Sequence, residues 1–482
     1  MSERRAVFGT IALSLGQAAK LGLQFAILPV LAHMLDPSAY GLVALAMPFV
    51  LLANMVSDAG LGNALVRVQA PSPALESTVF WLSVGICAVL MLLLWALAWP
   101  ASQWMQAPGL PPVMMALSGL LVLGGSLSVA NARIMRERRF AVFAAGDVAA
   151  SALSAAAAIA AALNGFGAWS LVIQQLVLWV VKAVWVSTAA GFCPKFVCSP
   201  SLAKPFLSFG LFAAASNVVD FIGKNAPTVL IGGVLGVLAT GRYSMSLQLT
   251  RMPDSLISGP IYLAIFSAIA RQGEADGRTA QLAQRGLRGV TTVVAPVFCG
   301  LALVADLVTT LFLGPRWSAV GPVLILLAPF GFLLCVYSIV GAVLLGLGRS
   351  KTQFRLTALA AAVAAASASA GAPFGLNAVA GALSLGVVLI SPIYLAVVAR
   401  ELNVGLGLLA GELAPPLAAT GVMALAVLAA RSQMAPLNLW LQLAASVGLG
   451  LVSFALALGM FSGRRLLADL KSLRPQAAAG VS

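Results

Sequence analysis

The sequence predicts an all-α integral membrane protein with about 14 transmembrane helices. Of its 482 residues, 61% are hydrophobic and only 9% are charged, and the mean hydropathy is +1.01. A soluble protein of this length needs far more charge on its surface. The apolar residues also gather in runs of about 20 or more, the length that crosses a bilayer as a helix. These observations exclude a water-soluble fold.

The predicted spans follow one another with short connections. Those in the first part of the chain are 8–34, 42–66, 78–99, 113–132, 141–163 and 168–190. Those in the rest are 207–234, 241–270, 287–311, 320–347, 356–372, 376–398, 405–430 and 438–461. The run at 356–372 is short and consists mostly of Ala, and the run at 405–430 contains Pro415 and Pro416. No connection is long enough for a soluble catalytic domain, so we expect the function to reside among the helices.

Basic residues mark one side of the membrane. With the N-terminus placed inside, about three quarters of the 28 Lys and Arg residues fall in inner segments, and only Arg242, Arg316 and Arg431 fall in outer ones. This distribution predicts an even number of spans with both termini in the cytoplasm. It also accounts for the net charge of +14 without a nucleic-acid partner. The first apolar run is too long for the core of a signal peptide, so we expect it to remain as a span.

Cysteine and histidine usage predicts no metal site and no cofactor. The five cysteines are scattered, and the single histidine, His33, is remote from the pair Cys193 and Cys198, whose spacing is not that of a metal motif. Reduced cytosolic thiols are the simplest interpretation.

A weak internal repeat relates the two halves of the chain. With a shift of 200 residues, the identities are Leu35 with Leu235, Ala39 with Ala239, and Gly41 with Gly241. Polar residues inside the first and seventh spans align under the same shift. We therefore predict two six-helix lobes of the same orientation, 1–200 and 201–400, followed by two accessory spans in 401–482. Parallel repeats of this kind are typical of transporters that bind substrate between the halves.

Charged and amide side chains inside the apolar spans are the candidate functional residues. A charge at bilayer depth costs about 2.5–3.5 kcal/mol on insertion scales, so it usually faces a partner or water. Gln17, Lys20 and Gln24 recur every three or four residues and form one stripe along the first span. The candidates for lining a polar cavity are Lys20, Lys182, Lys224, Arg251, Gln17 and Gln24, and the acids that remain are Asp58, Asp220 and Asp254.

Two interpretations are open for several of these charges. Asp220 and Lys224 are four residues apart, and Arg251 and Asp254 are three apart. In each pair the two charges can therefore form a local ion pair with no functional role. Lys182 lies near enough to the cytoplasmic interface for its long side chain to reach water.

Lys20 is different, because no acid lies one turn away on its own helix. We expect Lys20 to face a cavity. Asp58 is then either its partner or a binding site for H⁺ or Na⁺, and the residues do not separate these two roles. Asp147, Asp306 and Glu412 are expected to be hydrated or paired structurally.

The stretch "LPVLAHMLDPSAYGLVALAMPFVLLANMVSDAGLGNALVRVQ", residues 28–69, resembles the opening of a known family. The turn formed by Leu35, Pro37, Tyr40 and Gly41, and the segment "SDAGLGNALVR", are similar to those of the polysaccharide-transporter family. These are the Wzx-type flippases of the multidrug/oligosaccharidyl-lipid/polysaccharide exporter superfamily. Chain length, number of spans and the two-lobe arrangement agree with this family.

The resemblance implies a flippase of the bacterial inner membrane. Its cargo would be undecaprenyl-diphosphate-linked oligosaccharide, moved between leaflets by alternating access for lipopolysaccharide, exopolysaccharide or capsule biosynthesis. Membrane lipid, a polysaccharide polymerase and export machinery would be its partners. The cargo's diphosphate would meet Lys20, Lys182, Lys224 and Arg251, beside Gln17 and Gln24, while Asp58, Asp220 and Asp254 are candidates for an H⁺ or Na⁺ coupling site.

Two other functions compete with this one. A cation-coupled multidrug antiporter of the same superfamily would share the fold, but it requires an unpaired acid and no unpaired central lysine. A membrane enzyme, such as a polymerase or ligase acting on the lipid-linked glycan, should carry a sizeable outer domain or a catalytic His/Arg cluster. The sequence has neither, so we expect a transporter and not an enzyme.

Overall fold

The computed structural model describes residues 2–57, 65, 71–137, 139–197, 199–272, 277–434 and 436–473, with side chains outside 2–15, 56–57, 140, 200–220 and 462–473. In the first half of the chain the helices are α1 (Ser2–Met34), α2 (Pro37–Ser57), α4 (Pro73–Trp104), α5 (Leu110–Arg136), α6 (Phe140–Leu163), α7 (Ala168–Ala190) and α8 (Pro200–Pro253). In the second half the long helices are α9 (Gly259–Gln272), α10 (Gly277–Leu303), α12 (Val320–Gly346), α13 (Ser350–Gly371), α14 (Leu376–Glu401), α15 (Leu406–Met434) and α16 (Leu439–Leu473). Short elements among them are η1 (Asp254–Ser258), α11 (Ala305–Val308), η2 (Thr309–Leu313), η3 (Pro315–Trp317) and η4 (Ala372–Phe374).

The prediction of an all-helical membrane protein is confirmed. Twelve segments of the described residues are long and apolar enough to cross a membrane. One of them, Phe221–Gln272, has 52 residues and is broken at Gly236, whose φ of 80° is not helical, so it is long enough to cross twice. Because α1 adds a further helix of 33 residues, the total agrees with the prediction of about 14 spans.

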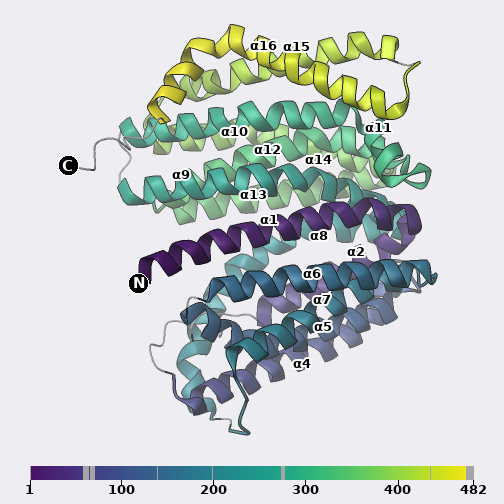
Figure 1. Cartoon of the computed structure of the whole chain (residues 1–482), viewed down its shortest axis with the longest axis vertical. Coiled ribbons are helices and arrows are strands. Elements are labelled where there is room, and N and C mark those ends of the chain that lie inside the picture. Colours follow the sequence, from purple (N-terminus) through teal and green to yellow (C-terminus); the bar gives the residue numbers. More distant parts are fainter. Residues whose placement is uncertain are drawn as a thin grey trace. The chain divides into compact units, whose positions relative to one another are not determined.

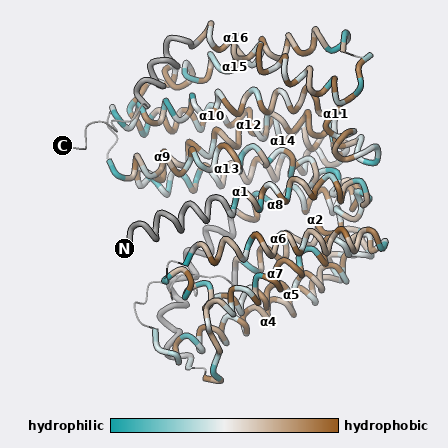
Figure 2. Tube along the Cα trace, in the orientation of Figure 1, coloured by the Kyte–Doolittle hydropathy of each residue, from teal (hydrophilic) through white to brown (hydrophobic). Residues whose placement is uncertain are grey.

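The outer surfaces of the helices are apolar, as a bilayer requires. Large hydrophobic side chains are widely exposed, for example Leu92 on α4, Leu389 on α14 and Met460 on α16. Apolar residues predominate in the coloured middle parts of these helices (Figure 2). Soluble monomers rarely expose contiguous apolar surface on this scale. The protein is therefore a multi-pass membrane protein.

The chain divides into two compact units, which we describe separately. The first unit comprises residues 1–245, 312–317 and 364–376, and the second comprises 246–311, 318–363 and 377–482. These boundaries differ from the predicted lobes 1–200, 201–400 and 401–482, which were drawn from the repeat in the sequence. The division into those lobes stays a prediction.

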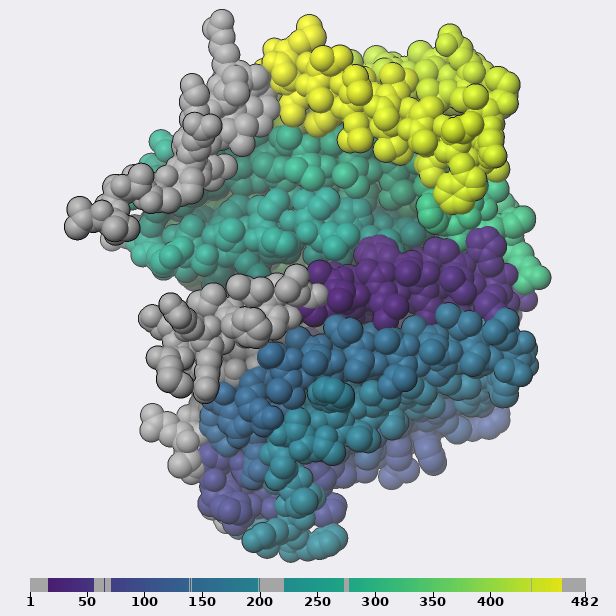
Figure 3. All heavy atoms as spheres, viewed as in Figure 1, coloured from purple at the N-terminus to yellow at the C-terminus, as the bar shows by residue number. Residues whose placement is uncertain are grey.

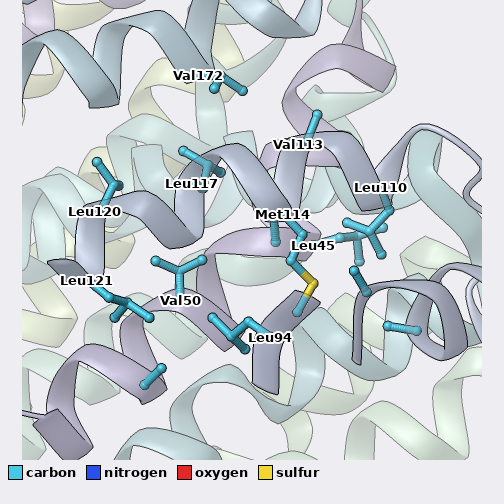
Figure 4. Packing of buried hydrophobic residues seen from close by; sticks show 14 of the residues in the cluster. Leu45, Val50, Leu94, Leu110, Val113, Met114, Leu117, Leu120, Leu121 and Val172 are labelled. Carbon is cyan, nitrogen blue, oxygen red and sulfur yellow. The ribbon is translucent and has the colours of Figure 1, made fainter. Parts of the chain in front are cut away.

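The core of the first unit forms where α5 packs against α2, α4 and α7. Leu45 and Val50 of α2, Leu94 of α4, Met114 of α5 and Val172 of α7 are nearly inaccessible and contact one another in this core (Figure 4). Leu110, Leu117 and Leu121 continue the same apolar face of α5 at helical spacing. The central position of α5 follows from this face, because it can be buried only by several neighbours at once.

The first helix packs along α6 (Figure 3). A Cβ on Gly16 would lie 2.8 Å from the Cβ of Ala144, and farther along the pair Ile27 and Ala155 belong to one buried cluster. The Gly16 contact and the later cluster follow in the same order along both helices, so α1 and α6 run parallel, with Gly16 beside Ala144. This register places the polar stripe of α1 relative to α6.

The turn after α1 packs against the turn at Gly236 in a reciprocal way. A Cβ on Gly41 would overlap the carbonyl group of Val237, and a Cβ on Gly241 would overlap the carbonyl group of Pro37. Each residue of one contact corresponds to a residue of the other under the shift of 200 positions. This is the self-complementary contact that two repeats related by a two-fold axis make with each other.

A short segment from the second half of the chain, Phe312–Trp317, belongs to the first unit. The Trp317 side chain is completely buried, and its Nε1 donates a hydrogen bond of 2.8 Å to the carbonyl oxygen of Ala32. Its ring lies edge-on to that of Tyr40, with centroids 5.1 Å apart, and Arg316 pairs with Asp36 at 3.2 Å. The segment is therefore anchored on the turn between α1 and α2.

In the second unit, α10 packs against α12 and α15, and α15 lies beside α16 (Figure 1). The pair formed by Arg288 of α10 and Glu412 of α15 is largely buried, with an N–O distance of 3.4 Å. At another point Arg431 of α15 pairs with Asp306 and donates a hydrogen bond to the Leu303 carbonyl oxygen. The expectation that Asp306 and Glu412 would be hydrated or paired is confirmed as pairing.

Candidate functional site: a lysine cluster in the first unit

The polar stripe of α1 shares one helix face with residues that are buried farther along. Gln17 and Gln24 are exposed and Lys20 is half-buried, whereas Ile27 and Leu31, later on the same face, are buried in a cluster with residues of α6. Among the described residues, no carboxylate lies within 4.0 Å of the Lys20 ammonium. Lys20 is thus held at the edge of a helix–helix contact with part of its length accessible.

Lys182 of α7 has two partners on α6. Its Nζ lies 2.7 Å from Oδ1 of Asp147, and 4.6 Å from the centre of the Phe143 ring. Asp147 and Phe143 are four residues apart, so they lie on the same face of α6. The side chains of Lys182 and Asp147 are 21% and 18% exposed. The expectation that Asp147 would be hydrated or paired is confirmed as pairing, and Lys182 has a carboxylate partner.

The packing of α6 against α7 fixes this pair. A Cβ on Gly146 would lie 2.5 Å from Cδ1 of Trp185, so only glycine permits the two helices to approach here. The Nε1 of Trp185 donates a hydrogen bond of 3.1 Å to the Val142 carbonyl oxygen. Lys182 lies one turn before Trp185 and is therefore aimed at the Asp147 face of α6.

The register of α1 against α6 brings Lys20 to the same level. Since Gly16 lies beside Ala144 and the two helices run parallel, Lys20, one turn after Gly16, lies near the level of Val148, the residue that follows Asp147. Asp147 is about 9 Å along the span that begins at Ala141, at a rise of 1.5 Å per residue. Two lysines from α1 and α7 thus lie at the level of one carboxylate from α6, at about a third of the depth of the span. The cluster of Lys20, Lys182 and Asp147 carries one net positive charge.

The other charged candidates of the first unit are not placed in this cluster by any contact. Lys224 on α8 is exposed and has interactions of its own. The side chain of Asp220 and the whole of Asp58 lie outside the described residues. Their predicted roles, and the choice between an Asp220–Lys224 pair and a functional pair, stay predictions.

Arg251 and Asp254 belong to the second unit, where the helix changes geometry. Asp254 begins the π-helical turn η1, directly after Pro253. Arg251 is exposed and Asp254 half-buried, and no contact within 4.0 Å joins these two charges. Pro253 and the wider π turn alter the α-helical spacing on which the local-pairing interpretation depended. Asp254 instead lies close enough to the thiol of Cys335 on α12 to interact with it.

The described residues contain no group of three or more His, Cys, Asp or Glu side chains that could hold a metal ion. In the cluster itself, Lys20 and Lys182 supply ammonium groups. Lysine in a half-buried site offers a compact positive charge with three donors, which suits phosphate oxygens.

Sequence comparison places the chain in a family. Residues 30–322, more than half of the chain, match the profile of a family described as "Polysaccharide biosynthesis protein". The chain belongs to the polysaccharide biosynthesis protein family. This agrees with the resemblance carried by residues 28–69.

Relatives within this family are named as transport or biosynthesis proteins. The succinoglycan biosynthesis transport protein ExoT of Rhizobium meliloti is 29% identical over 316 residues, which cover 65% of this chain and 64% of ExoT. The lipopolysaccharide biosynthesis protein WzxC of Escherichia coli is 23% identical over 341 residues, covering 70% of this chain and 68% of WzxC. The match thus spans slightly less than two thirds of ExoT and slightly more than two thirds of WzxC.

The fold is that of solved transporters. The lipid II flippase MurJ in an inward closed conformation superposes with a TM-score of 0.74 over 96% of this chain and 100% of its own, at 11% identity. An inward-facing multidrug resistance MATE family transporter of the MOP superfamily gives 0.61 over 82% of this chain and 98% of its own, at 16% identity. At these identities the likeness shows the fold alone.

The sequence analysis did not identify several residues whose contacts join helices of the first unit. Phe143 was not singled out, although its spacing of four from Asp147 places both on one helix face. Glu76, almost completely buried at the start of α4, accepts hydrogen bonds from Arg133, with Nε 3.1 Å from Oε1, and pairs with Arg136 at 3.4 Å. The sequence signal was an acid beside the first turn of one span and arginines at the end of the next.

Proposed function

We propose that the protein is a flippase that moves undecaprenyl-diphosphate-linked oligosaccharide across the bacterial inner membrane. The glycan would serve lipopolysaccharide, exopolysaccharide or capsule biosynthesis. Membership of the polysaccharide biosynthesis protein family supports this, as do the printed names of ExoT, WzxC and the lipid II flippase that shares the fold. In this proposal both termini lie in the cytoplasm, transport proceeds by alternating access, and a polymerase and export machinery receive the product.

The observation that carries the proposal is the cluster of Lys20, Lys182 and Asp147. Burying ammonium groups away from water is unfavourable, and two of them against one carboxylate leave an unneutralised positive charge. A lipid-linked diphosphate carries about two negative charges and would neutralise it. Gln17 and Gln24, accessible on the same stripe, can donate hydrogen bonds to the sugar or phosphate oxygens. Lys224 and Arg251 are further candidates for contacting the anionic cargo.

A cation-coupled multidrug antiporter is the second candidate. The MATE transporter's fold favours it, and Asp254, half-buried at the π-helical turn, is the described acid best suited to bind H⁺ or Na⁺. An excess of lysines in the first unit does not suit a cationic drug, because like charges repel. We therefore place Asp254, with Asp58 and Asp220, as candidates for ion coupling of flippase activity. We also propose a transporter in preference to a glycan polymerase or ligase.

Reconstitution in proteoliposomes tests the proposal. A fluorescent undecaprenyl-diphosphate-linked oligosaccharide is added, and its movement between leaflets is followed by a membrane-impermeant quencher, with and without H⁺ or Na⁺ gradients. Gradient-dependent movement of the lipid-linked probe supports a coupled flippase. Efflux of a cationic dye without movement of the lipid-linked probe would favour the antiporter, and extension of the glycan would favour the enzyme.

Lys20 variants sharpen the test. Lys20→Arg should keep substantial transport, since a second cation can meet phosphate, although Arg and Lys differ in geometry. Lys20→Gln should lose transport at normal membrane abundance. Lys351→Gln, a matched change on the exposed side of α13 in the second unit, should transport like the wild type. Wild-type transport by Lys20→Gln would refute the role of Lys20.

A further inference from the structure

The cluster contains the carboxylate of Asp147, whose negative charge opposes the binding of an anion. Oδ1 of Asp147 lies 2.7 Å from Nζ of Lys182. Along the helix axis, Asp147 is close to the level of Lys20. A purely structural acid is normally buried itself, as Glu76 is in its pair with Arg133, where the Glu76 side chain is 3% exposed. The Lys182–Asp147 pair is about one fifth exposed on both sides, so neither side chain is sealed inside packed protein.

We propose that Asp147 is an exchangeable counter-ion, which positions Lys182 while no cargo is bound and which the diphosphate of the cargo displaces. This inference rests on the proposed function. It assigns Asp147 as a positioning residue that determines the affinity for anionic lipid, and not as a direct ligand of the cargo.

The physical reason is the cost of isolated charge. A lysine inside an apolar bundle without a partner is expensive, so an empty site made of lysines alone would be unstable or would lose its protons. Asp147 supplies the missing negative charge. Phosphate oxygens compete for the same N–H donors, so the lysines stay neutralised when cargo replaces the carboxylate.

The surroundings allow this exchange. One side of the Lys182 ammonium is covered by the Phe143 ring at 4.6 Å, which leaves its hydrogen-bond donors for the open side where Asp147 lies. Trp185, packed on Gly146, keeps α6 and α7 in place when the pair is broken. The carboxylate should therefore weaken cargo binding and speed cargo release, because it restores the pair as the phosphate leaves.

Asp147→Asn separates this role from a structural one. The amide keeps the shape but removes the charge that competes with phosphate. We expect the KM for the fluorescent lipid-linked probe to fall by about fivefold, which corresponds to the interaction free energy of one partly exposed ion pair. The turnover rate should fall as well. Asp147→Glu, which keeps the charge, should restore both parameters toward the wild type.

Controls make each outcome decisive. Asp306→Asn removes the acid of another, more exposed ion pair, with Arg431 in the second unit, and should leave KM unchanged. If Asp147→Asn is not recovered from membranes, the neutral pair Asp147→Asn with Lys182→Gln replaces it and should raise KM, because the cation is lost. A KM for Asp147→Asn equal to or above that of the wild type would overturn the inference, as would a wild-type KM in the double variant.

Binding of undecaprenyl diphosphate without sugar, measured on the purified proteins, distinguishes failure of the flippase proposal from failure of the counter-ion inference. Tighter binding by Asp147→Asn than by the wild type supports the counter-ion role even before transport is assayed. If the wild type binds the probe but does not move it, the flippase proposal fails. If the wild type moves the probe and Asp147→Asn binds it no more tightly, only the counter-ion inference fails.

Discussion

Replacing Gly41 or Gly241 with alanine should destabilise the first unit. A Cβ on Gly41 would approach the carbonyl carbon of Val237 to 2.9 Å, and a Cβ on Gly241 would approach that of Pro37 to 2.7 Å. Ordinary contacts between carbon atoms lie near 3.5–4.0 Å, so the two turns must separate by roughly 1 Å. The obstructing atoms are backbone, which cannot move aside by a change of rotamer.

The magnitude follows from two opposing effects. Alanine in a helix is intrinsically more favourable than glycine by up to about 1 kcal/mol. Overpacking against a rigid neighbour costs about 1–3 kcal/mol, occasionally more. We expect each single variant to lose about 1–2 kcal/mol and its thermal midpoint to fall by roughly 3–6 °C. The double variant should lose less than the sum, because one separation of the turns relieves both overlaps.

The assay is the loss of the monodisperse peak in size-exclusion chromatography after heating the detergent-purified protein. Gly85→Ala on α4 and Gly119→Ala on α5 are matched controls, since a Cβ at either position would meet nothing within 4 Å. These controls should keep or slightly raise the midpoint. Midpoints of Gly41→Ala and Gly241→Ala equal to those of the controls would refute the reciprocal packing, and full additivity in the double variant would refute the shared contact.

Three further predictions concern a buried ion pair, a buried tryptophan and the topology. Glu76→Gln should lower stability by about 3 kcal/mol, because it leaves Arg133 and Arg136 beside a neutral amide, and thermal unfolding in detergent would detect it. Trp317→Phe should lose about 1 kcal/mol with the hydrogen bond to Ala32, whereas Trp317→Ala should lose about 3–5 kcal/mol; equal midpoints for the two variants would contradict a buried anchor. Reporter fusions at 100–112 should indicate the periplasm and fusions at 475–482 the cytoplasm, and the opposite result at the C-terminus would contradict the even number of spans.

The sequence by itself determined the class of the fold. Apolar runs of membrane length are set by the thickness of the bilayer, so they can be recognised without knowing what packs against what. Lys20 was recognised for the same reason, since a charge inside such a run is costly wherever the helix lies. The repeat also left a trace in Gly41 and Gly241, because only glycine permits the close approach that both positions require.

Only the tertiary structure decided which charges meet. Lys182 and Asp147 are far apart in the sequence, and Lys20 reaches their level through the register of α1 against α6. Arg251 and Asp254, for which the sequence left local pairing and a cavity role open, do not lie within 4.0 Å of each other in the described structure, where a proline and a π-helical turn intervene. Side-chain pairing between helices depends on rotation and axial register, and these are set by the packing of small residues such as Gly16 and Gly146. Composition and periodicity record how apolar a helix is, but they do not record the neighbour against which each face is turned.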